Sequence, residues 1–292
     1  MRPNQRFLRK PKSFWACVRT ISQEVGYTVR AAGRGNGPIR VPSAREMAQA
    51  FADLNLDPKL LRNDAGGPTE LGAELHSYFE YRAEVLNNHV RSQLMDMKAA
   101  KAEFERLRKE LCPKCPLPMN KQKGVMKAPA FLTGMVNMLI EAHSQGLPCD
   151  FDPRELTTIT KGGVPVRTLA RRVDGAFPSA VNPVAVWEIK EYYYTTTFGS
   201  RVADGIYESL LDGMELEELR EHEKVDIRHY LMADAFKTWW EDGRSYLCRM
   251  VDMVHMGYVD EVLFGREVIS EMPRIVSEWV RLEKTRADAE PH

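Results

Sequence analysis

The sequence predicts an α+β protein in which an α/β core follows a helical N-terminal region. Three observations predict this class. Apolar residues recur mainly at helical spacing up to residue 111, whereas strand-like and helical segments alternate from residue 129 onward. The 292 residues are enough for two domains with cores. We find no apolar run that approaches the roughly 18 residues of a membrane span, so we expect no membrane association.

Residues 1–65 are expected to form a basic helical module that binds DNA. Residues 13–31 carry apolar side chains at helical spacing, and Ser43 with Glu46 forms a capping-box pattern at the start of a second helix. Arg34, in a glycine-rich break, and Arg40 are candidate contacts to DNA. A helical cap with a solvated basic face explains the same pattern equally well.

The charges of the chain are unevenly distributed although its net charge is zero. Residues 1–45 hold ten Lys and Arg residues and one acid, while residues 204–292 hold 11 basic and 21 acidic residues. Because the net charge is zero, we do not expect a nucleic-acid-binding protein that is basic over its whole surface. The split instead predicts a polyanionic partner at one end of the molecule.

Residues 66–128 are expected to form a long helix or helical hairpin followed by a linker rich in proline and lysine. The helix carries a coiled-coil-like apolar stripe, which indicates intramolecular packing more often than a dimer seam. Cys112 and Cys115 stand in the linker without a second pair at a familiar zinc-site spacing, so we favour ordinary linker cysteines over zinc. The stripe residues are Leu86, Val90, Leu94, Met97, Phe104, Leu107 and Leu111.

Residues 129–292 are expected to form the α/β domain. A helix around residues 132–140 is followed by two strands within residues 156–174 that turn at Lys161-Gly162-Gly163. The remaining expected elements are a third strand at 184–194, a helix at 202–211, a fourth strand at 229–236 and a helix at 237–256.

Three polar residues of this region point to metal chemistry. Glu188 and Lys190 share one face of the third strand, because strand side chains alternate. If the hairpin between Asp174 and Glu188 is symmetric about Val181, the two carboxylates lie directly opposite each other, roughly 5 Å apart at Cβ. Two carboxylates at that separation repel each other unless a cation lies between them, and Mg²⁺ prefers such oxygen ligands.

This equipment suits metal-assisted hydrolysis of a phosphodiester. The metal holds a phosphate oxygen and an attacking water, and it stabilises the charge that develops on phosphorus. Lys190 is expected to orient the water or to transfer a proton, since burial can lower the pKa of a lysine. Glu191 should face the opposite side of the sheet and is not expected to bind the metal.

The pattern Asp174…Glu188-x-Lys190, on a hairpin between helices, resembles the PD-(D/E)XK nuclease superfamily, and within it the type II restriction endonucleases. The resemblance covers roughly residues 129–236. It implies a restriction-endonuclease-like mixed sheet flanked by helices, and a Mg²⁺-dependent double-stranded DNA endonuclease. Val173 replaces the proline that often precedes the aspartate, and Ala203 stands where exonuclease-like members carry glutamine.

The resemblance also implies an acid from the first core helix. Glu141 is the topological match and is favoured over Glu74, although it lies away from the centre of the apolar stripe. Four basic residues near the site are candidate phosphate contacts: Lys161, Arg171, Arg172 and Arg201. A homodimer is the natural assembly for cutting two strands, with the long helix as a candidate seam.

Other features narrow the function. There is no Gly-Lys-Ser/Thr phosphate loop, so no nucleotide cofactor is expected. Five cysteines without a secretory signal predict a reducing, cytoplasmic setting. Two alternatives stay open: a structure-specific or anti-phage nuclease without a fixed recognition sequence, and a non-catalytic DNA-binding protein of the same fold.

Overall fold

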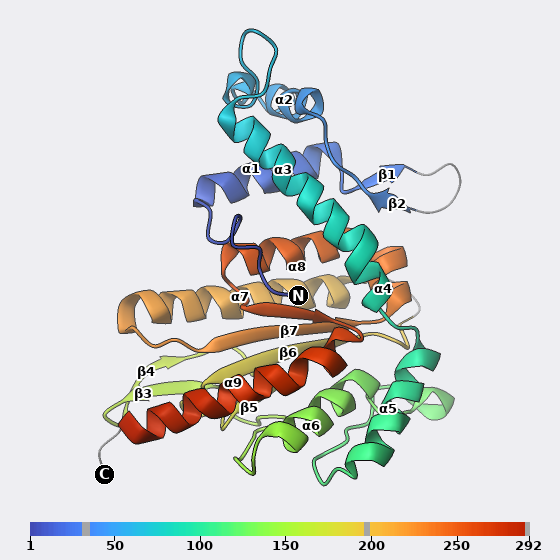
Figure 1. The fold of residues 1–292 in the computed structure, drawn as a ribbon, viewed down its shortest axis with the longest axis vertical. Helices are drawn as coiled ribbons and strands as arrows, with labels where there is room; N and C mark the ends of the chain where they lie inside the picture. Colours follow the sequence, from blue (N-terminus) through green and yellow to red (C-terminus); the bar gives the residue numbers. More distant parts are fainter. Residues whose placement is uncertain (31–35, 196–198, 290–292) are drawn as a thin grey trace.

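The computed structural model describes residues 1–30, 36–195 and 199–289. The N-terminal part packs three helices around one core, as Figure 1 shows. These are α1 (Lys12–Val25), α2 (Ala44–Asp53) and α3 (Glu70–Glu84), and a short hairpin, β1 (Thr28–Arg30) and β2 (Asn36–Ile39), projects beside them. Ser43 and Glu46 form the predicted capping box at the start of α2. The first helix is shorter than predicted, because it ends at Val25 before Gly26, which has a positive φ.

The predicted long helix is divided between two parts of the molecule. α3 continues through a π-helical turn (Val85–Val90) into α4 (Arg91–Gln93), and the chain then bends before α5 (Met97–Leu111), whose N-terminus Asp96 caps. Leu86 and Val90 pack under α8, whereas Phe104 and Leu107 pack against α6. Five of the seven stripe residues are buried within the chain and Met97 is exposed, so the favoured interpretation of the stripe as intramolecular packing is confirmed.

The C-terminal part is built on a four-stranded mixed sheet in the order β5-β6-β7-β8. β5 (Gly175–Phe177) runs antiparallel to β6 (Ala185–Glu191), and β7 (Arg228–Asp234) and β8 (Glu261–Phe264) continue in parallel with β6. A separate hairpin, β3 (Thr158–Lys161) and β4 (Val164–Thr168), turns at the predicted glycines. The α+β class is thus confirmed.

Helices cover both faces of this sheet. α6 (Phe131–His143) and α9 (Glu267–Ala289) pack on the face that carries Trp187, which stacks on Trp279. α7 (Ser200–Glu223) and α8 (Arg244–Met256) cover the other face, with a π-helical turn (Lys237–Asp242) before α8. Figure 1 shows α7 and α8 between the sheet and the N-terminal helices. Within the described ranges, no helix combines the length and apolarity needed to cross a bilayer.

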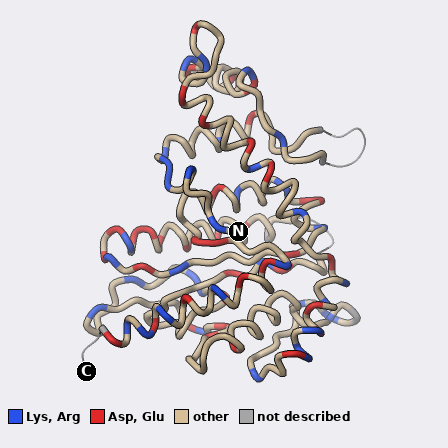
Figure 2. Tube along the Cα trace, viewed as in Figure 1, with Lys and Arg blue, Asp and Glu red and all other residues tan. Residues whose placement is uncertain are grey.

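The uneven charge of the sequence is partly neutralised inside the chain. The amino group of Met1 lies 3.2 Å from Glu267 and Arg2 pairs with Glu261 and Glu271, so the N-terminus is bound to the acidic C-terminal part. Figure 2 shows further acidic positions along α7, several of which also have basic partners. The charge split therefore reflects in part how the two halves of the chain bind each other.

Candidate active site

The backbone register brings the two predicted carboxylates together. Gly175 pairs with Trp187, Ala176 with Val186 and Phe177 with Ala185, which is the symmetry about Val181 that the sequence predicted. One step further along the same register, the backbone N–H of Asp174 donates to a Glu188 carboxylate oxygen at 3.2 Å. The Asp174 carboxylate in turn accepts from the N–H of Ile189 at 2.8 Å.

Gly175 makes this register possible. Strand residues alternate, so Trp187 faces away from Glu188, and its indole ring passes directly over Gly175. A Cβ atom at Gly175 would lie 2.0 Å from that ring. The Asp-Gly pair therefore opens a strand here, although such a pair more often marks a turn.

Lys190 and Arg171 close the site around Glu188. The Lys190 ammonium lies 2.7 Å from Glu188 Oε2, and the Arg171 guanidinium lies 2.9 Å from Glu188 Oε1. Glu188 is fully buried and Lys190 is nearly so. Both oxygens of Glu188 are thus held by cations in this arrangement.

Helix α7 supplies two further carboxylates that the sequence interpretation missed. Asp212 accepts from Arg171 at 2.6 Å, and Glu208 lies 3.4 Å from both Arg171 and Lys190. Their spacing of four residues places them on one face of the helix. Gly205, one turn earlier, lets α7 approach, because a Cβ there would lie 3.2 Å from the Lys190 side chain. This pattern was visible in the sequence, but only the packing of α7 shows that it meets Lys190.

The pKa values reflect this crowding of charges. Burial, followed by the nearby Glu188, raises the pKa of Asp174 to about 6 and that of Asp212 to about 7. Burial also acts to raise the pKa of Glu188, but Lys190 and Arg171 outweigh it, so that pKa is lowered. Glu188 is therefore ionised at neutral pH. Ionising Asp174 or Asp212 is less favourable here than it is for a carboxyl group in water.

Lys190 is a cation in this cluster. Burial alone lowers its pKa, but the carboxylates of Glu188 and Asp174 outweigh burial and raise it above the ordinary value. The expected lowering of the Lys190 pKa is therefore not found in this arrangement. Its ammonium group is suited to positioning a water or a phosphate oxygen rather than to removing a proton.

The cluster carries more carboxylates than cations. Four carboxylates face two cations, which leaves two negative charges when all six groups are ionised. Asp212 Oδ1 is buried and has no hydrogen-bond partner in the described part of the chain. No three Asp, Glu, His or Cys side chains of the described residues converge closely enough to hold a metal as they stand. Mg²⁺ often binds through one or two carboxylates and several waters, a number that Asp174 and Glu188 supply if Arg171 releases one oxygen.

Comparison with known families divides the chain at the bend after α4. Residues 95–279 match the family described as "Domain of unknown function (DUF7687)", and residues 1–89 match "Domain of unknown function (DUF7690)". The first match spans more than half of the chain. The chain belongs to the DUF7687 family. No curated protein and no solved structure matched it.

All six residues of the cluster lie in the DUF7687 region. The boundaries predicted from sequence, after residues 65 and 128, differ from this division. The predicted middle segment, 66–128, contributes its first helix to the N-terminal core and α5 to the core of the DUF7687 region. The two family matches meet within this predicted segment, between residues 89 and 95.

Neither predicted helix acid reaches the cluster. Glu141 lies on α6, which covers the opposite face of the sheet, and accepts from the backbone N–H of Lys114 at 2.9 Å. Glu74 pairs with Lys10 in the N-terminal part. The expectation that Glu141 joins Asp174 and Glu188 is not met, because the sheet separates them. Glu191 does face α6 as expected, accepting from Thr133 at 3.0 Å.

The predicted phosphate contacts have different surroundings. Arg171 is inside the cluster and Arg172, next to it, is exposed. Lys161 pairs with Glu223 at 2.9 Å, and Arg40 pairs with Glu46 and donates to the Val25 carbonyl, so both are engaged within the chain. Arg34 and the Arg201 side chain lie outside the described residues.

Proposed function

We propose that this DUF7687 protein is a Mg²⁺-dependent endonuclease that hydrolyses phosphodiester bonds of double-stranded DNA at a specific sequence, in the manner of a type II restriction enzyme. The observation that supports it most is the register between β5 and β6, which sets Asp174 against Glu188 with Lys190 beside them. The sequence resemblance to the PD-(D/E)XK superfamily supports the same chemistry independently of the helix acid.

Each group in the cluster has a role in this proposal. Asp174 and Glu188 would hold Mg²⁺, which when bound lowers the pKa of a water and neutralises charge on the phosphate. Lys190 would orient the attacking water through its ammonium group. Arg171 would move from Glu188 toward Asp212 or Glu208 and contact a phosphate oxygen, for which its planar fork is suited. DNA would approach from the side on which Glu208 is half-exposed.

The assembly and setting belong to the proposal as well. Two strands must be cut at one site, so a homodimer is proposed, with a seam other than the buried stripe of α3 to α5. A cytoplasmic location is also proposed, which the five free cysteines support, together with the absence of membrane partners.

Plasmid and phage DNA incubated with the purified protein test the proposal. Cleavage is expected with Mg²⁺ and not with EDTA, and Asp174→Asn is expected to abolish it. Glu191→Gln is the matched control, because Glu191 lies in the same sheet but faces α6. Discrete bands indicate a fixed recognition sequence, whereas a smear indicates the nuclease without one. Cleavage that survives in Asp174→Asn contradicts the assignment of the site.

One observation favours a second candidate, a non-catalytic DNA-binding protein of the same fold. Glu188 is fully buried, with both oxygens held by Arg171 and Lys190, which is also the arrangement of a purely structural ion cluster. DNA binding without any Mg²⁺-dependent cleavage would support this candidate and contradict the endonuclease.

A further inference from the structure

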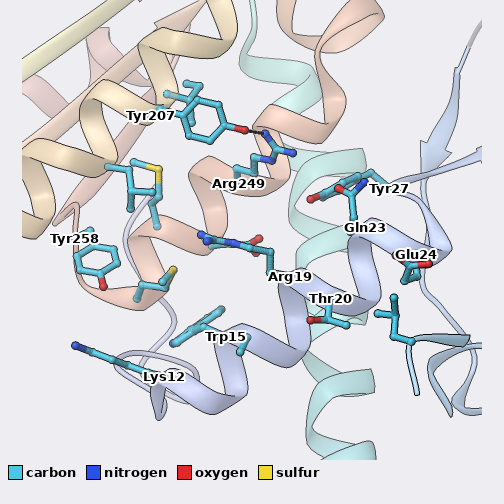
Figure 3. A pocket seen from close by; sticks show the side chains of 17 residues that line it. Lys12, Trp15, Arg19, Thr20, Gln23, Glu24, Tyr27, Tyr207, Arg249 and Tyr258 are labelled. Atoms are coloured by element: carbon cyan, nitrogen blue, oxygen red, sulfur yellow. Dashed lines mark hydrogen bonds between the residues drawn. The ribbon is translucent and has the colours of Figure 1, made fainter. Parts of the chain in front are cut away.

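A cavity of about 700 Å³ lies between the two family-matched regions, apart from the carboxylate cluster. Helix α1 forms one wall, and α7, α8 and Tyr258 form the other (Figure 3). Its volume is within the range of sites for small molecules. Nothing in the proposed cleavage reaction uses this cavity.

The cavity is cationic. Lys12 and Arg19 from α1 and Arg249 from α8 line it. Arg2, Lys10 and Arg40 of the N-terminal part are engaged by carboxylates, but Lys12 and Arg19 form no ion pair with any described residue. Figure 3 shows Arg19 extending from α1 toward α8.

The two acidic residues of the lining change this balance little. Asp252 is already neutralised, because it accepts two hydrogen bonds from the buried Arg82 at 3.1 Å and another from Tyr78. Glu24 is exposed at the rim. A ligand with a negative charge is therefore the one that this lining attracts.

The cavity is also aromatic. Trp15, Tyr27, Tyr207 and Tyr258 line it, and Arg249 lies 5.8 Å from the ring centre of Tyr27 and 5.6 Å from that of Tyr207. Trp15 is 5% exposed, and its indole N–H is buried without a partner among the described residues. The three tyrosines, which are half-buried or exposed, therefore supply the accessible ring faces of the cavity.

We infer that this cavity binds a mononucleotide. A nucleobase has the planar face that the exposed and half-buried Tyr side chains can stack on. Its phosphate is the group that Arg19 and Lys12 are suited to bind. A plain anion would leave the aromatic wall unused, and an uncharged aromatic would leave both cations unpaired. The absence of a Gly-Lys-Ser/Thr loop does not oppose this, because the binding groups here are side chains.

The site has a direct structural link to the cluster. Tyr207 and Leu210 of α7 line the cavity, while Glu208 and Asp212 of the same helix face Arg171. A bound nucleotide would therefore hold α1 against the helix that carries half of the carboxylates. Binding itself does not depend on the proposed nuclease function and is measured without cleavage.

Calorimetric titration of the full chain in EDTA tests the inference. The probes are AMP, GMP, CMP, UMP and ATP, with adenosine and inorganic phosphate as the two halves of the ligand. At least one nucleotide is expected to bind one to one, and roughly tenfold more tightly than either half alone. Arg19→Glu is expected to weaken that binding by roughly tenfold or more, and Arg19 is exposed, so folding is preserved.

Arg45→Glu is the matched control, because Arg45 is an exposed cation of α2 that does not line the cavity. Unchanged binding by this variant supports the inference. No heat with any nucleotide at millimolar concentration overturns it, and so does equal binding by Arg19→Glu and the parent. Tighter binding of a single-stranded DNA of about ten nucleotides than of every mononucleotide also overturns it, since that identifies a groove for nucleic acid.

Discussion

Replacing Arg171 with alanine should destabilise the protein, and Mg²⁺ should restore part of the loss. Arg171 contacts Glu188, Glu208 and Asp212 together, and two of these carboxylates are fully buried. Removing one partner of a buried ion pair costs about 3–5 kcal/mol. Because the Arg171 side chain is 23% exposed and Lys190 still holds Glu188, we expect the low end, about 3 kcal/mol.

The measurement is urea unfolding of both proteins, in EDTA and in Mg²⁺. A ligand at a hundred times its dissociation constant adds about 2.7 kcal/mol of stability, and the variant has one more uncompensated negative charge to offer the ion. The difference between the two proteins should therefore be smaller in Mg²⁺ than in EDTA. Arg106→Ala, which removes two surface ion pairs on α5, is the control and should cost about 0.5 kcal/mol or less.

Either of two results for Arg171→Ala would contradict this prediction. A loss below about 1 kcal/mol in EDTA would mean that the carboxylates are not crowded as the structure shows. An equal loss in EDTA and in Mg²⁺ would mean that no divalent cation replaces the guanidinium.

Three further predictions concern buried residues outside the carboxylate cluster. Burial raises the pKa of Asp234 from 3.8 to about 7, so the folded state binds more protons than the unfolded state in that window, and stability should fall as pH rises through it. Asp234→Asn should flatten part of that fall in urea midpoints measured from pH 4 to 8. Arg82→Met should cost about 3–5 kcal/mol in urea unfolding, because it leaves Asp252 without its buried partner; a cost like that of a surface pair would contradict this. Gly175→Ala should cost about 2 kcal/mol or more, because the new methyl overlaps the Trp187 ring; an unchanged melting temperature would show that the sheet shifts freely.

The sequence predicted the strand pairing at the site because local patterns determine it. Alternation in β6 fixes which side chains share a face with Glu188, and the length of the Pro178–Pro183 connection fixes the opposite partner of each residue. The capping box at Ser43 and the glycine turn after Lys161 are local in the same sense and are confirmed.

The parts that were missed depend on tertiary packing. The sequence gives no means of knowing that α6 covers the Trp187 face and α7 the Glu188 face, so Glu141 was chosen where Glu208 and Asp212 are found. Ion pairs such as Arg2 with Glu261 join residues far apart in the chain, so the sequence alone could not show how much of the charge split is neutralised internally. The last strand and helix, β8 and α9, were not predicted.

The central claim is that Asp174, Glu188 and Lys190 form a metal-dependent hydrolytic site. The initial rate at which the purified protein nicks supercoiled plasmid in Mg²⁺ tests it most directly, compared between the parent and Glu188→Gln after circular dichroism shows equal folding. The variant is expected to be slower by about a hundredfold or more. Nicking by Glu188→Gln at the parent's rate would contradict it.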